Sequence, residues 1–401
     1  MAQIATIVKR EKASADHPIL YLDAGDIEET TNRLSNLTKG TAMHRLFSHT
    51  GCDAATVGNA CWLRYGTGIL ADHARVASYP LLLANFAPVD GPVPSVLLGD
   101  VGVFGLTAPH QYMVGAVDWG FERLDILEQA VACARDLRAR GAELVVLLSH
   151  LGLEDPTEPW DDRRIAPELD GLVDVIVGAH THDLLPEGEW IGRVLVAQAG
   201  DYGGHIGRIE IDGESIAATV EPVPDDTPHD PAIAGEAARI DEEVAVFLAE
   251  PLGTIERPLD PAFVAEILRR RMNADVGLFA DGLAIGVVPP GLVTRGALYA
   301  ASETGANPGV TRMTGEQLLD LLARGNDPDF QAQTPHALRG RRRGTVHVAG
   351  GPIEPGREYV VAGTDYELEP HGGYARAEWG LETASDFPVI VREAIEEHLR
   401  G

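Results

Sequence analysis

The chain has 401 residues, of which 45% are hydrophobic, and a formal net charge of −29 at pH 7. This length accommodates two or more domains with sizeable cores, and the composition excludes general disorder. The acidic charge argues against binding to nucleic acid or to an anionic membrane, because phosphate attraction dominates such binding. No apolar run approaches the roughly 18 residues that span a bilayer, so we expect a soluble globular protein.

Cysteine content and the first residues indicate the compartment. The three cysteines, Cys52, Cys61 and Cys133, are odd in number and lack zinc-ribbon spacing. They predict no disulfide framework and fit a reducing compartment. Residues 1–10 lack the charged, apolar and cleavage regions of a signal peptide, so the chain as written is expected in the cytoplasm.

The first 62 residues predict two strands that each end in a polar turn. After a short helical stripe, a strand over 19–22 leads into Asp23-Ala24-Gly25-Asp26. A strand that ends in Gly-Asp turns sharply and presents a carboxylate at the sheet edge, although this dipeptide is also a common local turn. A helix over 38–47 then precedes a second strand and turn over 53–62, with Asn59 at the tip of the turn.

Two apolar runs, 143–150 and 173–182, each end on histidine. Runs of this length, separated by a segment that can return as a helix, predict buried neighbouring strands of an α/β sheet. Ligands of such sheets collect at the carboxyl ends of the strands, where His150, His180 and His182 fall. Neutral imidazole offers a lone pair to a metal or a proton. Each histidine alone could be a capped loop residue, but three after consecutive strands favour a site.

Helical spacing and a composition break organise the rest of the chain. Residues 121–141 carry apolar side chains at helical spacing, and with the strands on either side they predict a βαβ unit. Residues 221–231 contain four prolines and three aspartates, which indicates a linker. A helix is expected over 231–248.

Six short motifs follow one another along the chain: Leu22-Asp23-Ala24-Gly25-Asp26, Thr38-Lys39-Gly40, Val57-Gly58-Asn59, Leu148-Ser149-His150-Leu151-Gly152, Gly178-Ala179-His180-Thr181-His182 and Gln198-Ala199-Gly200-Asp201-Tyr202-Gly203. In this order and spacing they resemble the landmarks of the 5'-nucleotidase branch of the calcineurin-like metallophosphoesterases. The resemblance covers residues 1 to about 220 and continues, more weakly, through a C-terminal domain similar to that of 5'-nucleotidases.

The resemblance implies an α/β fold: a four-layer αββα metallophosphoesterase sandwich over 1–222, a linker and bridging helix over 223–252, and a smaller α+β domain over 253–401. It also implies divalent transition metals, namely manganese, zinc, iron or cobalt. The family carries two, about 3.5 to 4 Å apart, and we expect one or two per chain. A small phosphorylated substrate is expected as partner, with neither nucleic acid nor membrane, while the oligomeric state is left open.

The resemblance also assigns roles to individual residues. Asp26 matches the carboxylate that bridges both metals. Asn59, His150 and His180 match the other protein ligands of the second metal, and His182 matches a ligand of the first. Tyr366 and Tyr374 lie where family members place aromatic residues that stack a base, with ordinary packing as the alternative for each tyrosine.

Two positions depart from the family pattern. The family opens with a strand ending in Asp-x-His, which supplies two ligands of the first metal, and this chain has no counterpart. The family also follows Gly-Asn with a histidine that assists the phosphate and the leaving group, whereas this chain has Ala60. Loss of such a group costs about two to four powers of ten in rate. Either the natural start lies upstream of Met1, with export as in the relatives, or the protein is a divergent member with one competent metal site.

Three functions are compatible with these features. The first is a metal-dependent phosphoester hydrolase that acts on a nucleotide or another small phosphomonoester, with activity impaired by an incomplete first metal site. The alternative is a catalytically degenerate protein that keeps the fold and binds a metal or a ligand. The third is a hydrolase for a different small ester. The fold expectation is almost independent of this choice, because function resides in the site.

Overall fold

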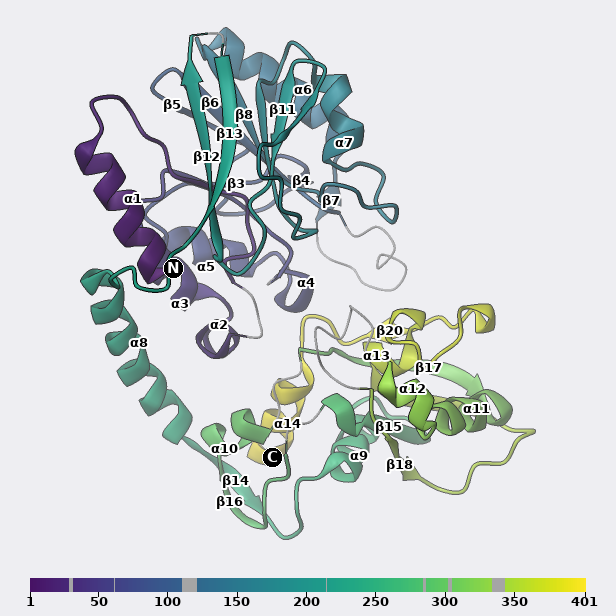
Figure 1. Cartoon of the computed structure of the whole chain (residues 1–401). Helices are drawn as coiled ribbons and strands as arrows, with labels where there is room; N and C mark the ends of the chain where they lie inside the picture. Colours follow the sequence, from purple (N-terminus) through teal and green to yellow (C-terminus); the bar gives the residue numbers. More distant parts are fainter. Residues whose placement is uncertain are drawn as a thin grey trace. The chain divides into compact units, whose positions relative to one another are not determined.

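The computed structural model describes residues 1–28, 32–60, 62–109, 121–213, 215–283, 286–301, 305–333 and 343–401. The chain divides into two compact units, the first ending at Asp241 and the second running from Glu242 to Gly401. The division lies within α8 (Pro231–Ala249), the long helix in Figure 1. This helix falls inside the stretch 223–252 that the sequence assigns to a linker and bridging helix. The boundaries at 222 and 252 stay a prediction.

Two sheets form the centre of the first unit. The smaller has the order β1-β2-β3 and is parallel, and the larger has the order β10-β11-β9-β8-β6-β5. The pairs β4-β7 and β12-β13 are antiparallel. The strands are β1 (Leu22–Asp23), β2 (Ala54–Thr56), β3 (Leu81–Leu82), β4 (Phe86–Ala87), β5 (Ser95–Leu98), β6 (Val101–Thr107), β7 (Glu122–Arg123), β8 (Leu144–His150), β9 (Val175–Gly178), β10 (Glu189–Ile191), β11 (Val194–Ala197), β12 (His205–Asp212) and β13 (Ser215–Pro222).

The two apolar runs of the sequence are β8 and β9. They pair in parallel, with Leu148 opposite Val177 and Ser149 opposite Gly178. Every residue of β8 after Leu144 is buried, because protein covers both faces of the sheet. The prediction of neighbouring buried strands is confirmed. Both strands end at the same edge of the sheet, and this edge carries the histidines.

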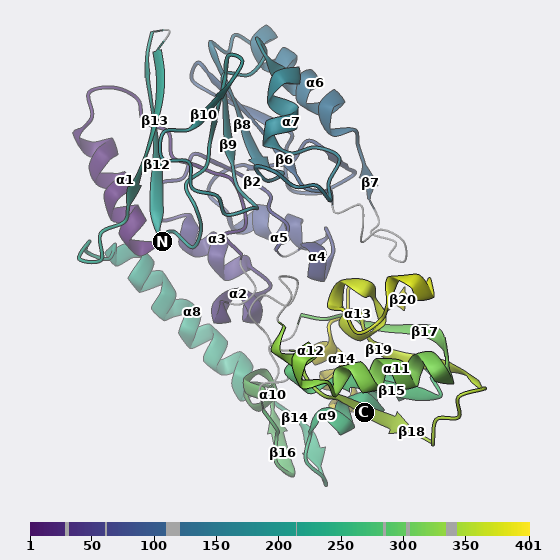
Figure 2. The same ribbon diagram turned by 45° about the vertical axis from the view of Figure 1, so that its right-hand side comes forward.

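Side chains of both sheets share one core, and helices cover the outer faces. Apolar residues between the sheets include Ala54, Leu82, Val103, Val146, Leu148, Val175 and Leu195. The opposite face of the larger sheet packs on α6, and Figures 1 and 2 show α1 and α6 on opposite sides of the sheets. This order of layers confirms the predicted α/β sandwich. The helices are α1 (Ala2–Ser14), α2 (Arg33–Thr38), α3 (Thr41–Phe47), α4 (Trp62–Tyr65), α5 (Ile69–Val76), α6 (Ile126–Ala139), α7 (Asp162–Ile165) and the 3-10 turn Ala166–Leu169.

Several element starts differ from the sequence prediction. The helix predicted from residue 121 begins at Ile126, because the Asp125 side chain accepts a hydrogen bond from Glu128 N and caps the helix there. The helix predicted from residue 38 is divided: α3 begins after Gly40, whose φ of +86° interrupts the helical backbone. The first strand is confined to Leu22–Asp23, so its predicted start at residue 19 is wrong.

The second unit is built on a mixed five-stranded sheet of order β18-β15-β19-β17-β20. It has the α+β character that the sequence predicts. Its strands are β14 (Pro251–Ile255), β15 (Val276–Ala280), β16 (Gly291–Thr294), β17 (Pro308–Thr314), β18 (Val346–Gly350), β19 (Glu358–Thr364) and β20 (Ala384–Ser385). Its helices are α9 (Pro261–Arg271), α10 (Arg295–Ala301), α11 (Gly315–Gly325), α12 (Pro328–Ala332), α13 (Asp365–Leu368) and α14 (Val391–Arg400), with 3-10 turns Asp281–Leu283, Pro370–Gly372 and Ala377–Trp379. Across the described residues of both units, no helix has the length and apolar character needed to cross a membrane.

Candidate metal centre

Two glycine turns bring the ends of β1 and β2 together. Gly25 has φ +99° and the next residue, Asp26, has φ +63°. A Cβ atom on Gly25 would lie 2.8 Å from the Gly58 nitrogen, and a Cβ atom on Gly58 would overlap Asp26 Oδ1. Neither position has room for a side chain, so the two turns pack directly against each other. This contact places the Asp26 carboxylate beside the turn that carries Asn59.

His150, the last residue of β8, completes a group of three side chains. Its Nε2 atom lies 3.0 Å from Asn59 Oδ1 and 3.2 Å from Asp26 Oδ2. The other carboxylate oxygen of Asp26 accepts a hydrogen bond from Ala60 N at 2.7 Å. Asn59 and His150 are 3% and 1% exposed, so water does not screen these contacts. The structure therefore brings Asp26, Asn59 and His150 together, as the sequence motifs suggest.

The hydrogen bonds of His150 show what this group is suited to bind. Nδ1 of His150 lies 2.7 Å from the Ala24 carbonyl oxygen. A carbonyl only accepts, so Nδ1 carries a proton. Nε2 faces two oxygen atoms, which a proton on Nε2 or a cation in its place would satisfy. One nitrogen and two oxygens that converge in a buried place favour a positive charge among them, and this set of atoms suits a divalent transition metal. Metal-binding histidines usually donate a hydrogen bond from the ring nitrogen that does not bind the metal, as Nδ1 of His150 does here.

Charge on the neighbouring residues reinforces this arrangement. Burial alone lowers the pKa of His150, but the Asp26 carboxylate and the hydrogen bond to Ala24 outweigh burial and raise the pKa above its usual value. A positive charge at His150 Nε2 is thus favoured by its surroundings. A metal ion held by the same atoms would supply the positive charge that these surroundings favour.

The two histidines after β9 have different surroundings. Both adopt left-handed backbone conformations, with φ of +75° at His180 and +64° at His182. The His180 ring lies 5.1 Å from the His150 ring, centroid to centroid, and burial lowers the pKa of His180. His182 is half exposed, and its Nδ1 atom is 3.4 Å from Asp201 Oδ2. The structure thus places His180 beside the group of three and gives His182 a carboxylate partner.

Asp155 is a neighbour of the centre that sequence reasoning missed. Its Oδ2 atom lies 3.7 Å from His180 Nε2. The neighbouring His180 imidazole is the main cause that holds the pKa of Asp155 well below its usual value, so the residue is a carboxylate. Its only sequence signal is its position five residues after His150 in an irregular acidic loop, which carries no periodic pattern.

Behind the centre lies a buried carboxyl group, that of Asp162. Ser149 Oγ donates a hydrogen bond to Asp162 Oδ1, while Oδ2 has no hydrogen-bond partner in the part of the chain that the structure describes. A Cβ atom on Gly178 would overlap Asp162 Oδ2, so glycine at the end of β9 leaves room for this group. Burial raises the pKa of Asp162 to about 8. The group is therefore mostly protonated at pH 7.

We expect Asp162→Asn to remove a pH dependence of stability. Because the folded pKa of about 8 lies above the ordinary value of 3.8, the folded state binds the extra proton between these values. The free energy of unfolding then falls as pH rises through this window, by at most about 1.4 kcal/mol per pH unit. Urea unfolding at pH 5 and pH 8.5 checks this: the wild type should lose stability relative to Asp162→Asn at the higher pH. Parallel pH profiles would contradict the raised pKa.

Tyr366 and Tyr374 lie in the core of the second unit. They are 6% and 1% exposed. The hydroxyl of Tyr374 accepts a hydrogen bond from Gly344 N, and its ring packs edge-on against Phe330. Tyr366 packs edge-on against His371. These contacts are those of side chains that pack in a core. Base stacking by either tyrosine stays a prediction, and it would need one face of the ring to become exposed.

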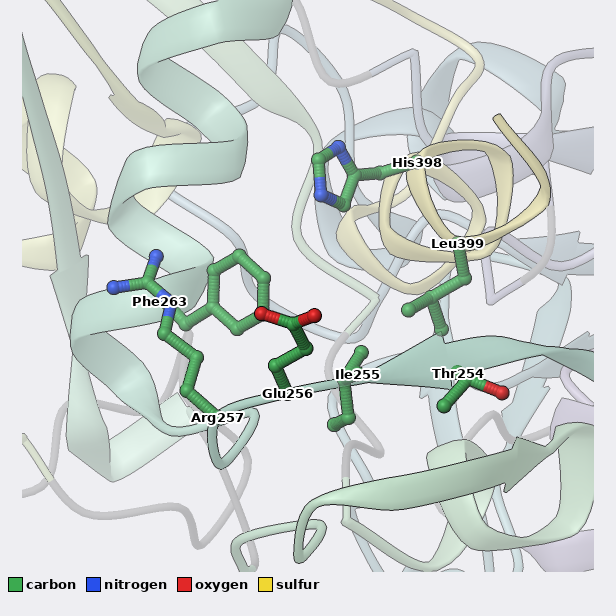
Figure 3. A pocket seen from close by; sticks show the side chains of 7 residues that line it. All are labelled: Thr254, Ile255, Glu256, Arg257, Phe263, His398 and Leu399. Atoms are coloured by element: carbon green, nitrogen blue, oxygen red, sulfur yellow. The ribbon is translucent and has the colours of Figure 1, made fainter.

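A surface pocket in the second unit is separate in sequence from all the predicted site residues. Figure 3 shows that it is formed by the end of β14, the start of α9 and the end of α14. Its lining residues are Thr254, Ile255, Glu256, Arg257, Phe263, His398 and Leu399. The Arg257 guanidinium stacks 4.0 Å from the centre of the Phe263 ring. None of the predicted site residues lines this pocket, and we assign it no function.

Comparison with known proteins gives a consistent relationship. The family model described as the 5'-nucleotidase C-terminal domain matches residues 259–378. The uncharacterized metallophosphoesterase YunD of Bacillus subtilis is 24% identical over 436 residues, which cover 97% of this chain and 90% of that protein. The family implies the use of divalent metals, and its members are phosphoesterases.

Solved structures share the fold. The 5'-nucleotidase precursor of Thermus thermophilus superposes with a TM-score of 0.57 at 19% identity, and the NAD nucleotidase of Haemophilus influenzae with 0.60 at 17% identity. Each match covers 100% of this chain and 90% of the other. At these identities the likeness shows the two-domain fold. Together with the C-terminal match and the likeness to YunD along almost the whole chain, it leads to one conclusion: the chain is similar, along its length, to the 5'-nucleotidases of the calcineurin-like metallophosphoesterases.

Proposed function

We propose that the protein is a metal-dependent hydrolase that acts on a nucleotide or another small phosphomonoester. The observation that carries this proposal is that His150 Nε2 lies 3.0 Å from Asn59 Oδ1 and 3.2 Å from Asp26 Oδ2 in a buried place. The named activities of the relatives support the substrate class. The third possibility, a different small ester, has no observation in its favour.

We propose that Asp26, Asn59, His150 and His180 hold one divalent transition metal, and that His182 contributes to a second. Divalent metals in such centres polarise phosphoryl oxygens and lower the pKa of water. The protein contributes orientation. Ala60 N holds one oxygen of Asp26, and the Ala24 carbonyl fixes the His150 ring so that Nε2 faces the centre.

Turnover is expected to be slow. Ala60 is 3% exposed, and its methyl group offers neither a proton nor a hydrogen bond to a departing oxygen. In addition, none of the 14 histidines in the 401 residues has an aspartate two positions before it. The residues present therefore supply a fuller ligand set for one metal than for two. These features equally support the alternative function, a protein that keeps the centre and binds a metal or a phosphorylated ligand without turnover.

A chelation experiment tests the proposed function. The protein is dialysed against EDTA and then assayed with p-nitrophenyl phosphate and with nucleoside 5'-monophosphates, before and after addition of Mn²⁺. We expect no turnover without metal and slow turnover after Mn²⁺ is restored. Turnover that is insensitive to the chelator would contradict a metal-dependent hydrolase. Metal-dependent binding of a nucleotide without turnover, measured by calorimetry, would select the alternative.

A further inference from the structure

A second group of metal-binding side chains lies inside the first unit, apart from the residues of the candidate centre. It consists of Glu28, which follows the β1 turn, His44 of α3 and His73 of α5. These side chains are 6%, 0% and 0% exposed. One ligand atom from each lies within 4.8 Å of the others. Burying two imidazoles and a carboxylate in one place costs free energy unless protons or a cation between them satisfy their polar atoms.

The inner atoms of this cluster converge on one carboxylate oxygen. His44 Nε2 lies 2.6 Å from Glu28 Oε1, and His73 Nδ1 lies 3.5 Å from the same oxygen. The two rings are adjacent, with centroids 4.4 Å apart. Ligand atoms around a tetrahedral zinc ion, at about 2.0 Å from the metal, are roughly 3.3 Å apart. The distance from His73 to Glu28 already matches this spacing, and the distance from His44 to Glu28 needs only a small turn of the carboxylate.

The outer nitrogens show that His73 presents a lone pair inward. Its Nε2 atom lies 2.7 Å from the Lys39 carbonyl oxygen, which can only accept, so Nε2 carries the proton. Burial lowers the pKa of His73, which favours the neutral ring. Nδ1 of that ring is then an acceptor that faces a carboxylate, and it has no hydrogen bond among the described residues. Two acceptors that face each other in a buried place repel unless a cation lies between them.

The surroundings of His44 complete the pattern. Its outer nitrogen, Nδ1, lies 2.8 Å from the Tyr79 hydroxyl, and burial raises the pKa of Tyr79 so that the hydroxyl stays protonated. Each histidine therefore has one nitrogen directed at the carboxylate and the other held by an oxygen. Histidines that bind metals are oriented by outer partners of this kind. Hydrogen bonds alone do not account for His73 Nδ1, which has no hydrogen bond among the described residues.

We propose that Glu28, His44 and His73 form a second, structural site for a divalent transition metal, with zinc as the best match to two imidazoles and one carboxylate. The site joins α3, α5 and the segment that follows the Asp26 turn. Because Glu28 is two residues after Asp26, a metal here would hold that turn in place from inside the unit. The proposal is independent of the proposed hydrolase function, since it shares no side chain with the candidate centre.

The test uses the full chain with the candidate centre removed by His150→Ala and His180→Ala together. This variant is loaded with Zn²⁺, dialysed and analysed for metal, and its thermal unfolding is followed with and without Zn²⁺. We expect one retained equivalent and a higher unfolding midpoint. X-ray absorption at the zinc edge should show two imidazole ligands. Retention of no metal would overturn the proposal, whatever the hydrolase activity of the wild type.

Added single substitutions locate the retained metal. In the same background, His73→Gln should weaken Zn²⁺ binding by at least about tenfold, because one of three protein ligands is lost. The matched control is His17→Gln, whose exposed side chain lies outside the cluster and should leave binding unchanged. Circular dichroism checks folding, and if His73→Gln does not fold, the absorption spectrum of the Co²⁺-loaded parent variant still reports the coordination. A retained metal unaffected by His73→Gln, or one without imidazole ligands, would contradict the assignment.

Discussion

Replacing His150 with alanine is expected to remove one tightly held metal ion per chain and to reduce phosphoester hydrolysis to background. His150 Nε2 is the atom on which Asn59 Oδ1 and Asp26 Oδ2 converge. Without it, the two oxygens lose the nitrogen atom that both of them approach. Loss of an outer partner of a metal ligand typically costs 10- to 100-fold in affinity or activity, and we expect loss of the ligand itself to cost at least about 100-fold. Elemental analysis after dialysis and a p-nitrophenyl phosphate assay measure both effects.

The control for this substitution is His205→Ala. His205 begins β12 in the same unit, and it is only partly buried. We expect its replacement to leave both metal content and turnover unchanged. If His150→Ala retained its metal and its turnover while remaining folded, the candidate centre would be assigned to the wrong residues.

Introducing histidine at position 60 is expected to raise the rate. Ala60 follows Asn59 in the turn, and its backbone N–H already holds the Asp26 carboxylate. An imidazole here would be placed to assist a departing oxygen, and general acid catalysis contributes about two to four powers of ten. Because Ala60 is buried, the larger histidine side chain could destabilise the fold. The stability of Ala60→His is therefore measured together with kcat and KM.

The double variant with His180→Ala decides what a gain means. A rise in kcat with Ala60→His that vanishes when His180 is also replaced supports a dormant phosphoesterase site. Equal rates in the wild type and both variants would mean that the turnover comes from elsewhere. Fast wild-type turnover that is lost with His180→Ala alone would show that Ala60 is no handicap.

The sequence was sufficient to predict the strands and helices that have a long run of apolar residues or a long apolar periodicity. The runs that became β8 and β9 are apolar along almost their whole length, and their pairing follows from burial on both faces. Boundaries set by single residues were less predictable. Asp125 and Gly40 start helices later than periodicity indicates, because a side-chain cap and a left-handed glycine act locally and leave the apolar spacing unchanged.

Within the site, the residues at strand ends were predictable and their neighbours were not. Asp26, Asn59 and His150 lie at or just after the ends of β1, β2 and β8, but β8 belongs to a different sheet from β1 and β2, so the resemblance to the family, and not the order of strands, grouped them. Asp155 reaches His180 from an irregular loop, and Asp162 acquires its raised pKa from burial beneath that edge. Neither effect has a sequence pattern, because each depends on atoms that are distant along the chain.

The most direct test of the central claim is an anomalous difference map from a crystal of the Mn²⁺-loaded protein. We predict a peak within about 2.0 to 2.5 Å of His150 Nε2, Asn59 Oδ1 and Asp26 Oδ2, since these are ordinary distances for such ligands. A loaded and active protein with no anomalous peak among these three atoms would contradict the assignment of the metal centre.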